Sequence, residues 1–172
     1  NAVFGDAAGD SVGGNITTLS VSGTTTVNAA TVTTTSTQTY TGNVTFNNGV
    51  TFTGTTVTFN SNLDGSSDSL AITGNAVFGD AAGDSVGGNI TTITVSGTTT
   101  VNGGTVTSTS TQTYTGNVTF NNDVVFTGTT VTFNEDLNGS ADSLTITGNA
   151  VFGDAADDVV GATITTIAVS GT

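Results

Sequence analysis

The chain repeats itself with a 74-residue period. The phrase "NAVFGDAA" begins at Asn1, at Asn75 and again at Asn149. The first two copies, 1–74 and 75–148, differ at 12 positions, and the third copy, 149–172, is partial. The segment "TQTYTGNVTFNNGVTFTGTTVTF" at 37–59 returns at 111–133 with only two changes. An enzyme needs its site only once, whereas repeated units build length, so a fixed period indicates a repeat architecture.

Each repeat divides again into four pieces of nearly equal length. The pieces are 1–18, 19–37, 38–56 and 57–74, so no piece is more than one position longer than another. In each piece, alternating segments such as Val44–Phe46 flank a small polar turn. Uniform pieces of this size are typical of a β-solenoid, in which stacked coils share a core that no coil forms alone. The sequence therefore predicts an all-β fold: a parallel β-helix of 18–19-residue coils, four coils per 74-residue repeat, running as one continuous segment over 1–172.

This architecture makes a specific demand on strand pairing. Each strand must pair with residues 19 or fewer positions away, so that Phe46, for example, pairs with a residue near position 64. The rival architecture is a string of 74-residue β-sandwich domains. The 18–19-residue sub-period and the absence of Pro and Trp weigh against it.

The alternation of apolar residues with Thr predicts which side chains point inward. Thr, Val, Ile, Phe and Tyr are strong strand formers, and strict alternation gives each strand one buried face and one exposed face. Phe46, Phe52, Phe59 and Phe78 are candidates for aromatic stacking from coil to coil. The full set expected to point inward is Leu19, Val21, Tyr40, Val44, Phe46, Val50, Phe52, Val57, Phe59, Leu70, Ile72 and Phe78.

The composition excludes several classes of chemistry. The chain contains no Lys, Arg, His or Cys. It therefore lacks an imidazole base, a thiolate nucleophile or zinc ligand, and an amine for Schiff-base chemistry. Without basic residues it has no clamp for nucleic acid or for an anionic membrane, and no apolar run is long enough to cross a bilayer. We expect no enzymatic activity, no nucleic-acid partner and no membrane insertion.

The thirteen acidic residues are clustered, and no basic side chain exists to pair with them. In the expected stacking, the turns that carry Asp64 and Asp68 neighbour the turns that carry Asp80 and Asp84. Carboxylates on adjacent turns repel one another or bind cations, and oxygen ligands, with Asn62 and backbone carbonyls added, suit calcium. The predicted metal site comprises Asp64, Asp68, Asp80, Asp84, Asp142, Asp154 and Asp158, with Glu135, Asp136 and Asp157 nearby in the second set. The alternative is a solvated acidic turn, since the spacing matches neither of the common calcium-loop patterns.

Three further interpretations use other features of the sequence. Paired carboxylates are the catalytic groups of glycosidases, so they suggest that activity. Against it, the acids recur with the repeat, and no aromatic or cationic subsite accompanies them. The Thr runs at 24–26 and 31–37 raise ice binding, although along the sequence the Thr array is irregular from coil to coil and Thr is simply a good exposed strand residue. Acceptor sequences for N-glycosylation begin at Asn15, Asn43, Asn89, Asn117 and Asn138, and in a Thr-rich chain such matches arise by chance.

The phrases "SVSGTTTVNAATVTTTSTQTYTGNVTF", "TGTTVTFNSNLDG" and "SLAITGNAVFGDA" give the chain a family resemblance. Over its whole length it resembles the β-strand repeat regions of filamentous-haemagglutinin-like large exoproteins, and it is similar to the passenger repeats of autotransporter adhesins. The resemblance implies a right-handed parallel β-helix on a bacterial surface or in a biofilm matrix. It carries over no adhesion target, because the binding and secretion domains of such proteins are not in this sequence.

These observations lead to one leading hypothesis about function. We expect a non-enzymatic structural segment of an extracellular fibre or surface adhesin, secreted or held at the cell surface. We also expect it to be a piece of a longer, processed chain that self-associates into a filament or matrix. The second hypothesis is a calcium-, sugar- or ice-binding module built on the same solenoid.

Overall fold

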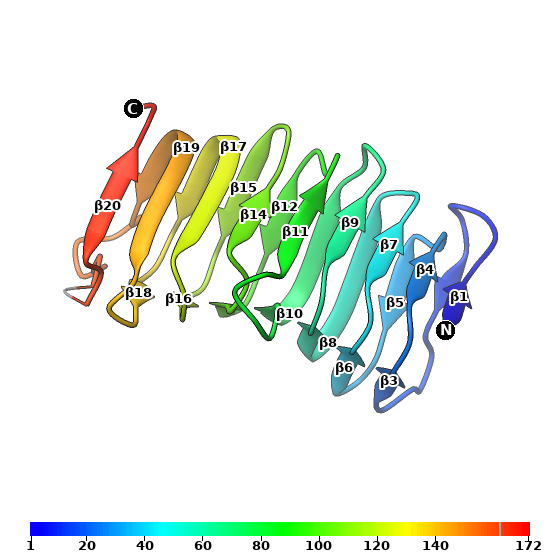
Figure 1. Cartoon of the computed structure of the whole chain (residues 1–172). Coiled ribbons are helices and arrows are strands. Elements are labelled where there is room, and N and C mark those ends of the chain that lie inside the picture. Colours follow the sequence, from blue (N-terminus) through cyan, green and yellow to red (C-terminus); the bar gives the residue numbers. More distant parts are fainter. Residues whose placement is uncertain (162) are drawn as a thin grey trace.

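The structure, a computed structural model, describes residues 1–161 and 163–172. These residues form twenty β-strands in one continuous sheet, and they contain no helix. Figure 1 shows the strands side by side along a single axis, from β1 (Ala2–Phe4) near the N-terminus to β20 (Thr166–Val169) near the C-terminus. The pairings among the described strands are parallel. The predicted parallel β-helix is therefore confirmed.

The strands stack in three columns, which we call faces A, B and C. Each coil of the chain visits A, then B, then C. Four long strands turn a corner and contribute to two faces: β8 (Val50–Phe59) and β10 (Leu70–Phe78) to B and C, and β17 (Val124–Phe133) and β19 (Ser143–Phe152) to A and B.

The remaining strands each belong to one face. On face A lie β1, β4 (Thr25–Val27), β7 (Val44–Phe46), β9 (Leu63–Gly65), β11 (Ser85–Gly88), β14 (Thr105–Thr107) and β20. On face B lie β2 (Ser11–Val12), β5 (Thr31–Thr33), β12 (Ile93–Val95) and β15 (Thr111–Tyr114). On face C lie β3 (Leu19–Val21), β6 (Thr37–Tyr40), β13 (Thr99–Val101), β16 (Val118–Phe120) and β18 (Leu137–Gly139).

The register of the pairing sets the length of a coil. Phe46 pairs with Gly65, as the sequence predicts, and Leu19 pairs with Gln38, which pairs in turn with Val57. The position number rises by 19 from each of these partners to the next, and by 20 in pairs such as Val50 with Leu70. The first coil departs from the prediction, because Ala2 pairs with a residue 23 positions further on. The average coil is thus slightly longer than predicted.

Because the coils are longer, the 74-residue repeat does not hold four of them. One repeat contributes eleven strand positions, and three positions complete a coil, so each repeat makes three coils and two thirds. The copies of the first strand show the result. Ala2–Phe4 lies on face A, its second copy 76–78 on face C, and its third copy 150–152 on face B. Each repeat is turned by one face relative to the repeat before it.

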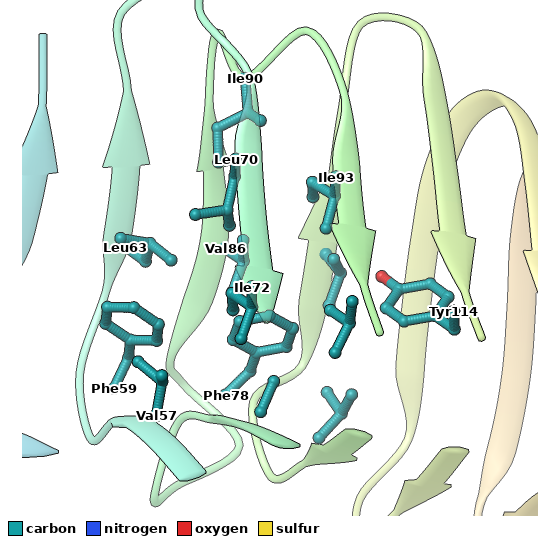
Figure 2. Close-up of a cluster of buried hydrophobic side chains, with 14 of the residues drawn as sticks. Val57, Phe59, Leu63, Leu70, Ile72, Phe78, Val86, Ile90, Ile93 and Tyr114 are labelled. Carbon is teal, nitrogen blue, oxygen red and sulfur yellow. The ribbon is translucent and has the colours of Figure 1, made fainter. Parts of the chain in front are cut away.

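The core runs through the centre of the coils without a break. Of the twelve side chains predicted to point inward, ten are buried, and Leu19 and Val21 in the first coil are partly buried against them. Figure 2 shows part of this core, with Phe59, Leu63 and Phe78 enclosed between the strands. The period-2 alternation therefore located the inward face correctly.

Aromatic rings stack from coil to coil in two ladders of three rings along the core. The first ladder is Tyr40, Phe59 and Phe78, which runs from the first repeat into the second, with ring centroids 5.3 and 6.2 Å apart and nearly parallel planes. Phe52 meets the ladder edge-on from face B. The predicted ladder is thus right for Phe59 and Phe78. It is wrong for Phe46, whose ring lies on face A over Gly65, where an added Cβ would be only 2.5 Å from it.

A buried glutamine joins two faces of the coil. The side-chain amide of Gln38 donates to the carbonyl oxygens of Val32 and Thr53, at 3.0 and 2.8 Å, and its oxygen accepts from the Tyr40 hydroxyl at 2.8 Å. Both donors and the acceptor are thereby satisfied, which a fully buried amide needs. Burial raises the pKa of the Tyr40 hydroxyl, so it stays a donor. Gln112 and Tyr114 repeat the arrangement in the second copy.

The corner inside β10 requires glycine. Gly74 has φ 121°, and a Cβ there would lie 1.8 Å from the carbonyl oxygen of Gly54 on the coil below. Two residues of β8 oppose one residue of β10 at this corner, so the two strands slip by one position as they pass from face B to face C.

The assignment of inward and outward positions can be tested at neighbouring residues. Phe59 is buried and Thr58 points outward from the same strand. Phe59→Asp should destabilise the fold by roughly 3–5 kcal/mol, because it places an unpaired charge in the core. Thr58→Asp should lower the melting temperature only slightly. Thermal melts followed by circular dichroism make the comparison, and equal losses in the two variants would show that the faces are misassigned.

Candidate functional site: the acidic loops

The acidic loop, defined here as residues 5–10 and their copies 79–84 and 153–158, closes on its own carboxylate. In the second copy, Asp84 Oδ2 accepts the backbone N–H groups of Asp80 and Ala81, at 3.0 and 2.9 Å. The loop opens at Gly79, whose φ of 78° lies in the left-handed region that glycine enters at no steric cost. The last aspartate of each loop is therefore an acceptor for backbone amides.

The same geometry holds in the other two copies. Asp10 accepts from the N–H groups of Asp6 and Ala7, and Asp158 accepts from those of Asp154 and Ala155. The bonds from Asp6 and Ala7 hold the pKa of the Asp10 carboxyl below its usual value, because they favour the ionised form. Stability from this group is present above the pKa of the unfolded chain and is lost as the pH falls through the lowered value.

The acidic loop also explains the longer coils. Strand pairs that span residues 79–84, such as Leu63 with Val86 and Ala76 with Thr99, join positions whose numbers differ by 23. In pairs that span no such loop the numbers differ by 19 or 20. The three or four extra residues are therefore accommodated outside the stack, and the register of the strands on either side is kept.

The predicted metal ligands of the first set are spread over different surroundings. Asp64 points outward from β9 on face A, and Asp68 lies in the turn before β10, where its backbone oxygen accepts from Thr91 N. Asp80 is exposed, and Asp84 closes its loop. Asn62, the expected additional ligand, uses its side-chain oxygen to accept from the N–H and hydroxyl of Ser85.

The second set, Asp142, Asp154 and Asp158 with their neighbours, lies where the charges are densest. The carboxylate of Asp158 raises the pKa of the Glu135 carboxyl by repulsion, helped by partial desolvation and by Asp154, Asp157 and Asp136. Asp136 replaces Asn62 of the first repeat and keeps its contact, since it accepts from the N–H of Val159 at 2.8 Å. The backbone oxygen of Asp142 accepts from Thr165 N.

The acids therefore repel one another without forming a ready-made metal centre. Among the described residues, no group of three or more Asp and Glu side chains is placed to hold a metal ion. Nor does a pocket open on the surface of residues 1–161 and 163–172. Calcium binding stays a prediction, and the role that the geometry does show for these carboxylates is hydrogen bonding to loop amides.

Sequence reasoning missed the capping role of the last loop aspartate. Its signal was present, because an aspartate four residues after the aspartate of a Gly-Asp pair recurs in all three copies of the loop. A short acidic side chain at that spacing is suited to accept amide bonds from its own turn.

No protein-family model, curated protein or solved structure matches this chain. The resemblance to exoprotein repeats therefore stays a prediction from the quoted phrases. The described residues also include no helix long and apolar enough to cross a membrane.

The capping role predicts different consequences for two aspartates of one loop. Asp84→Ala removes the acceptor for two amides and should lower the melting temperature by a few degrees. Asp80→Ala, at an exposed side chain of the same loop with the same change in charge, should have little effect. Thermal melts and amide hydrogen exchange at Ala81 provide the measurement. Equal melting temperatures and equal exchange in the two variants would rule out the cap.

The charge density around Glu135 predicts a pH- and salt-dependent effect. Because the pKa of Glu135 is raised in the folded chain, the ionised carboxylate destabilises the fold, whereas the protonated carboxyl does not. Glu135→Gln should therefore raise the melting temperature at pH 7. The gain should shrink in high salt and vanish as the pH falls below the pKa of glutamate.

The same melts test the calcium prediction in the unsubstituted chain. A bound divalent cation would raise the melting temperature with concentration, whereas sodium chloride at the same ionic strength would only screen. Coincident curves in calcium and in matched sodium chloride would mean that the loops are a solvated surface.

Proposed function

We propose that this chain is a non-enzymatic structural segment of an extracellular fibre or surface adhesin. One observation carries the proposal. Each 74-residue repeat adds the same eleven strand positions to one uninterrupted stack, so the quantity that grows with repeat number is length. With strands about 4.8 Å apart, three coils and two thirds extend the stack by roughly 18 Å per repeat.

The fold supports resistance to proteases as a second property. The backbone of each inner coil is hydrogen-bonded to the coils on both sides, and cleavage requires a segment to open locally. The connections between strands are short, and the longest recurrent one, the acidic loop, is held by its own aspartate. The absence of Lys and Arg also removes every cleavage point for trypsin-like enzymes.

Self-association into a filament or matrix belongs to the same proposal. The net charge of −13 keeps single chains apart in low salt, because no basic side chain offsets it. Lateral contact between chains therefore calls for cations in the medium, which screen or bridge the carboxylates. The extracellular location rests on the resemblance of the quoted repeat phrases alone.

The length hypothesis can be tested in the full-length natural protein by changing one quantity at a time. Deletion of one complete repeat, residues 75–148, should shorten the stalk seen by electron microscopy by roughly 18 Å. A matched variant keeps every residue but carries Thr→Ser at outward positions 39, 58 and 100, and its length should not change.

The functional measurement is the distance from the cell surface at which a domain joined to the end of this segment can still bind its target. We expect this distance to increase with the number of repeats and to be unchanged by the outward substitutions. Activity that is lost with the outward substitutions, at unchanged length, would contradict a spacer role and favour a binding surface.

A further inference from the structure

Face B carries a regular array of threonines that the linear sequence conceals. The Thr grid is defined as the first and last residues of five stacked segments: 31–33, 51–53, 71–73, 94–96 and 113–115. Their sequences are TVT, TFT, AIT, TVS and TYT, so eight of the ten positions are Thr and the other two are Ala and Ser. Along the sequence these segments alternate with strands of the other two faces, which is why the Thr array looks irregular before the coils are stacked.

The strand register aligns the grid from coil to coil. Thr31 pairs with Thr51, which pairs with Ala71, and Thr33 pairs with Thr53, which pairs with Thr73. The column continues from Ala71 to Thr94 and on to Thr113. Neighbours within a column are about 4.8 Å apart and the two columns are about 6.6–6.8 Å apart, from the spacing of strands and of alternate residues.

The core holds this surface in place from below. The middle residue of each segment points inward and is buried, as for Phe52, Ile72 and Tyr114. Thr is branched at Cβ, so its χ1 is restricted and its hydroxyl and methyl groups keep fixed directions. The grid is therefore a preorganised set of methyls and hydroxyls and loses little freedom on binding.

The threonine hydroxyls of the grid are not used within the chain. Among the described residues, no hydrogen bond is made by a hydroxyl of the eight grid threonines, whereas the Ser96 hydroxyl accepts from Gly74 N. These side chains are partly or fully exposed. Their hydrogen-bonding capacity is directed to whatever lies on the face.

The grid is also uncharged in a chain that carries thirteen acids. On face A, Asp64 and Gly87 interrupt the column of outward-pointing threonines. On face C, the outward column includes Val77, and the column beside it includes Asn60 and Asn102. The grid therefore offers no charged side chain to a salt ion or a charged polymer. It also lacks the aromatic platforms on which sugar rings stack.

We propose that the Thr grid of face B binds ice. A repeating two-dimensional array of fixed hydroxyl and methyl groups can anchor an equally regular layer of water, and an ice crystal can grow onto that layer. The methyl groups release poorly bonded water and the hydroxyls complete hydrogen bonds to the lattice. This inference is independent of the spacer role, because it depends on outward side chains and not on length.

The test compares substitutions on two faces of the 172-residue chain. Thr53→Tyr places a bulky ring at the centre of the grid, and Thr45→Tyr places the same ring on face A. Thermal hysteresis, crystal shape and inhibition of ice recrystallisation are measured for both variants and for the unsubstituted chain. We expect activity in the unsubstituted chain, its loss in Thr53→Tyr and its retention in Thr45→Tyr.

Circular dichroism melts show whether each variant is folded. If Thr53→Tyr does not fold, Thr113→Tyr, on another coil of the grid, replaces it in the comparison. The absence of hysteresis and crystal shaping in the unsubstituted chain would overturn the proposal. Equal loss from the face A substitution would overturn it as well. Neither result bears on the length of the stalk, so the spacer role is judged separately.

Discussion

Backbone hydrogen bonding between one coil and the next determines the rest of this structure. Val44 N donates to Asn62 O at 2.9 Å, and its copy Val118 N donates to Asp136 O at 2.8 Å. A parallel ladder places each residue directly over its counterpart one coil away. The aromatic ladders, the Gln38 corner and the outward columns of threonine all follow from that register, because like residues recur at the same step. A slip of one residue would send every inward side chain to the surface.

The fold accommodates its negative charge by using carboxylates as hydrogen-bond acceptors. No cationic side chain is available, so the acids lie at corners, in loops or on the outer face, and several accept backbone amides. Asn62 and Asp136 occupy equivalent positions and each accepts a backbone N–H, although only Asp136 is charged. A charge can therefore be added at such a corner without changing its geometry. What the added charge changes is the repulsion felt by its neighbours, as at Glu135.

Much of the fold was accessible from the sequence because two periods dominate it. The alternation of residues located the inward face, and the sub-period near 19 located the pairing of Leu19, Gln38 and Val57. The error in the number of coils per repeat came from the acidic loop. The extra residues of this loop lengthen a coil without altering any strand. Division of the repeat into four equal pieces therefore puts the end of the first coil too early in the sequence.

The buried polar network and the loop caps were harder to predict. Gln38 follows the inward pattern, but its burial is tolerable only because two carbonyls and a tyrosine hydroxyl meet it at the corner. Such a convergence depends on residues from three strands and is invisible in any one of them. The metal prediction assumed that acids on neighbouring turns point toward a common centre. In the structure three of these carboxylates, Asp84, Asp136 and Asp158, accept backbone amides, a role that the metal prediction did not include.

The rotation of each repeat by one face has a consequence for how such a chain can change through recombination. Gain or loss of a single 74-residue unit preserves the reading frame and every strand pairing, because three-face stacking accepts any strand position after any complete repeat. It nevertheless swings everything beyond the junction by a third of a turn about the axis. Only steps of three units, or eleven full coils, restore the original heading. A change in the number of repeats would thus turn the later coils around the axis as well as move them along it.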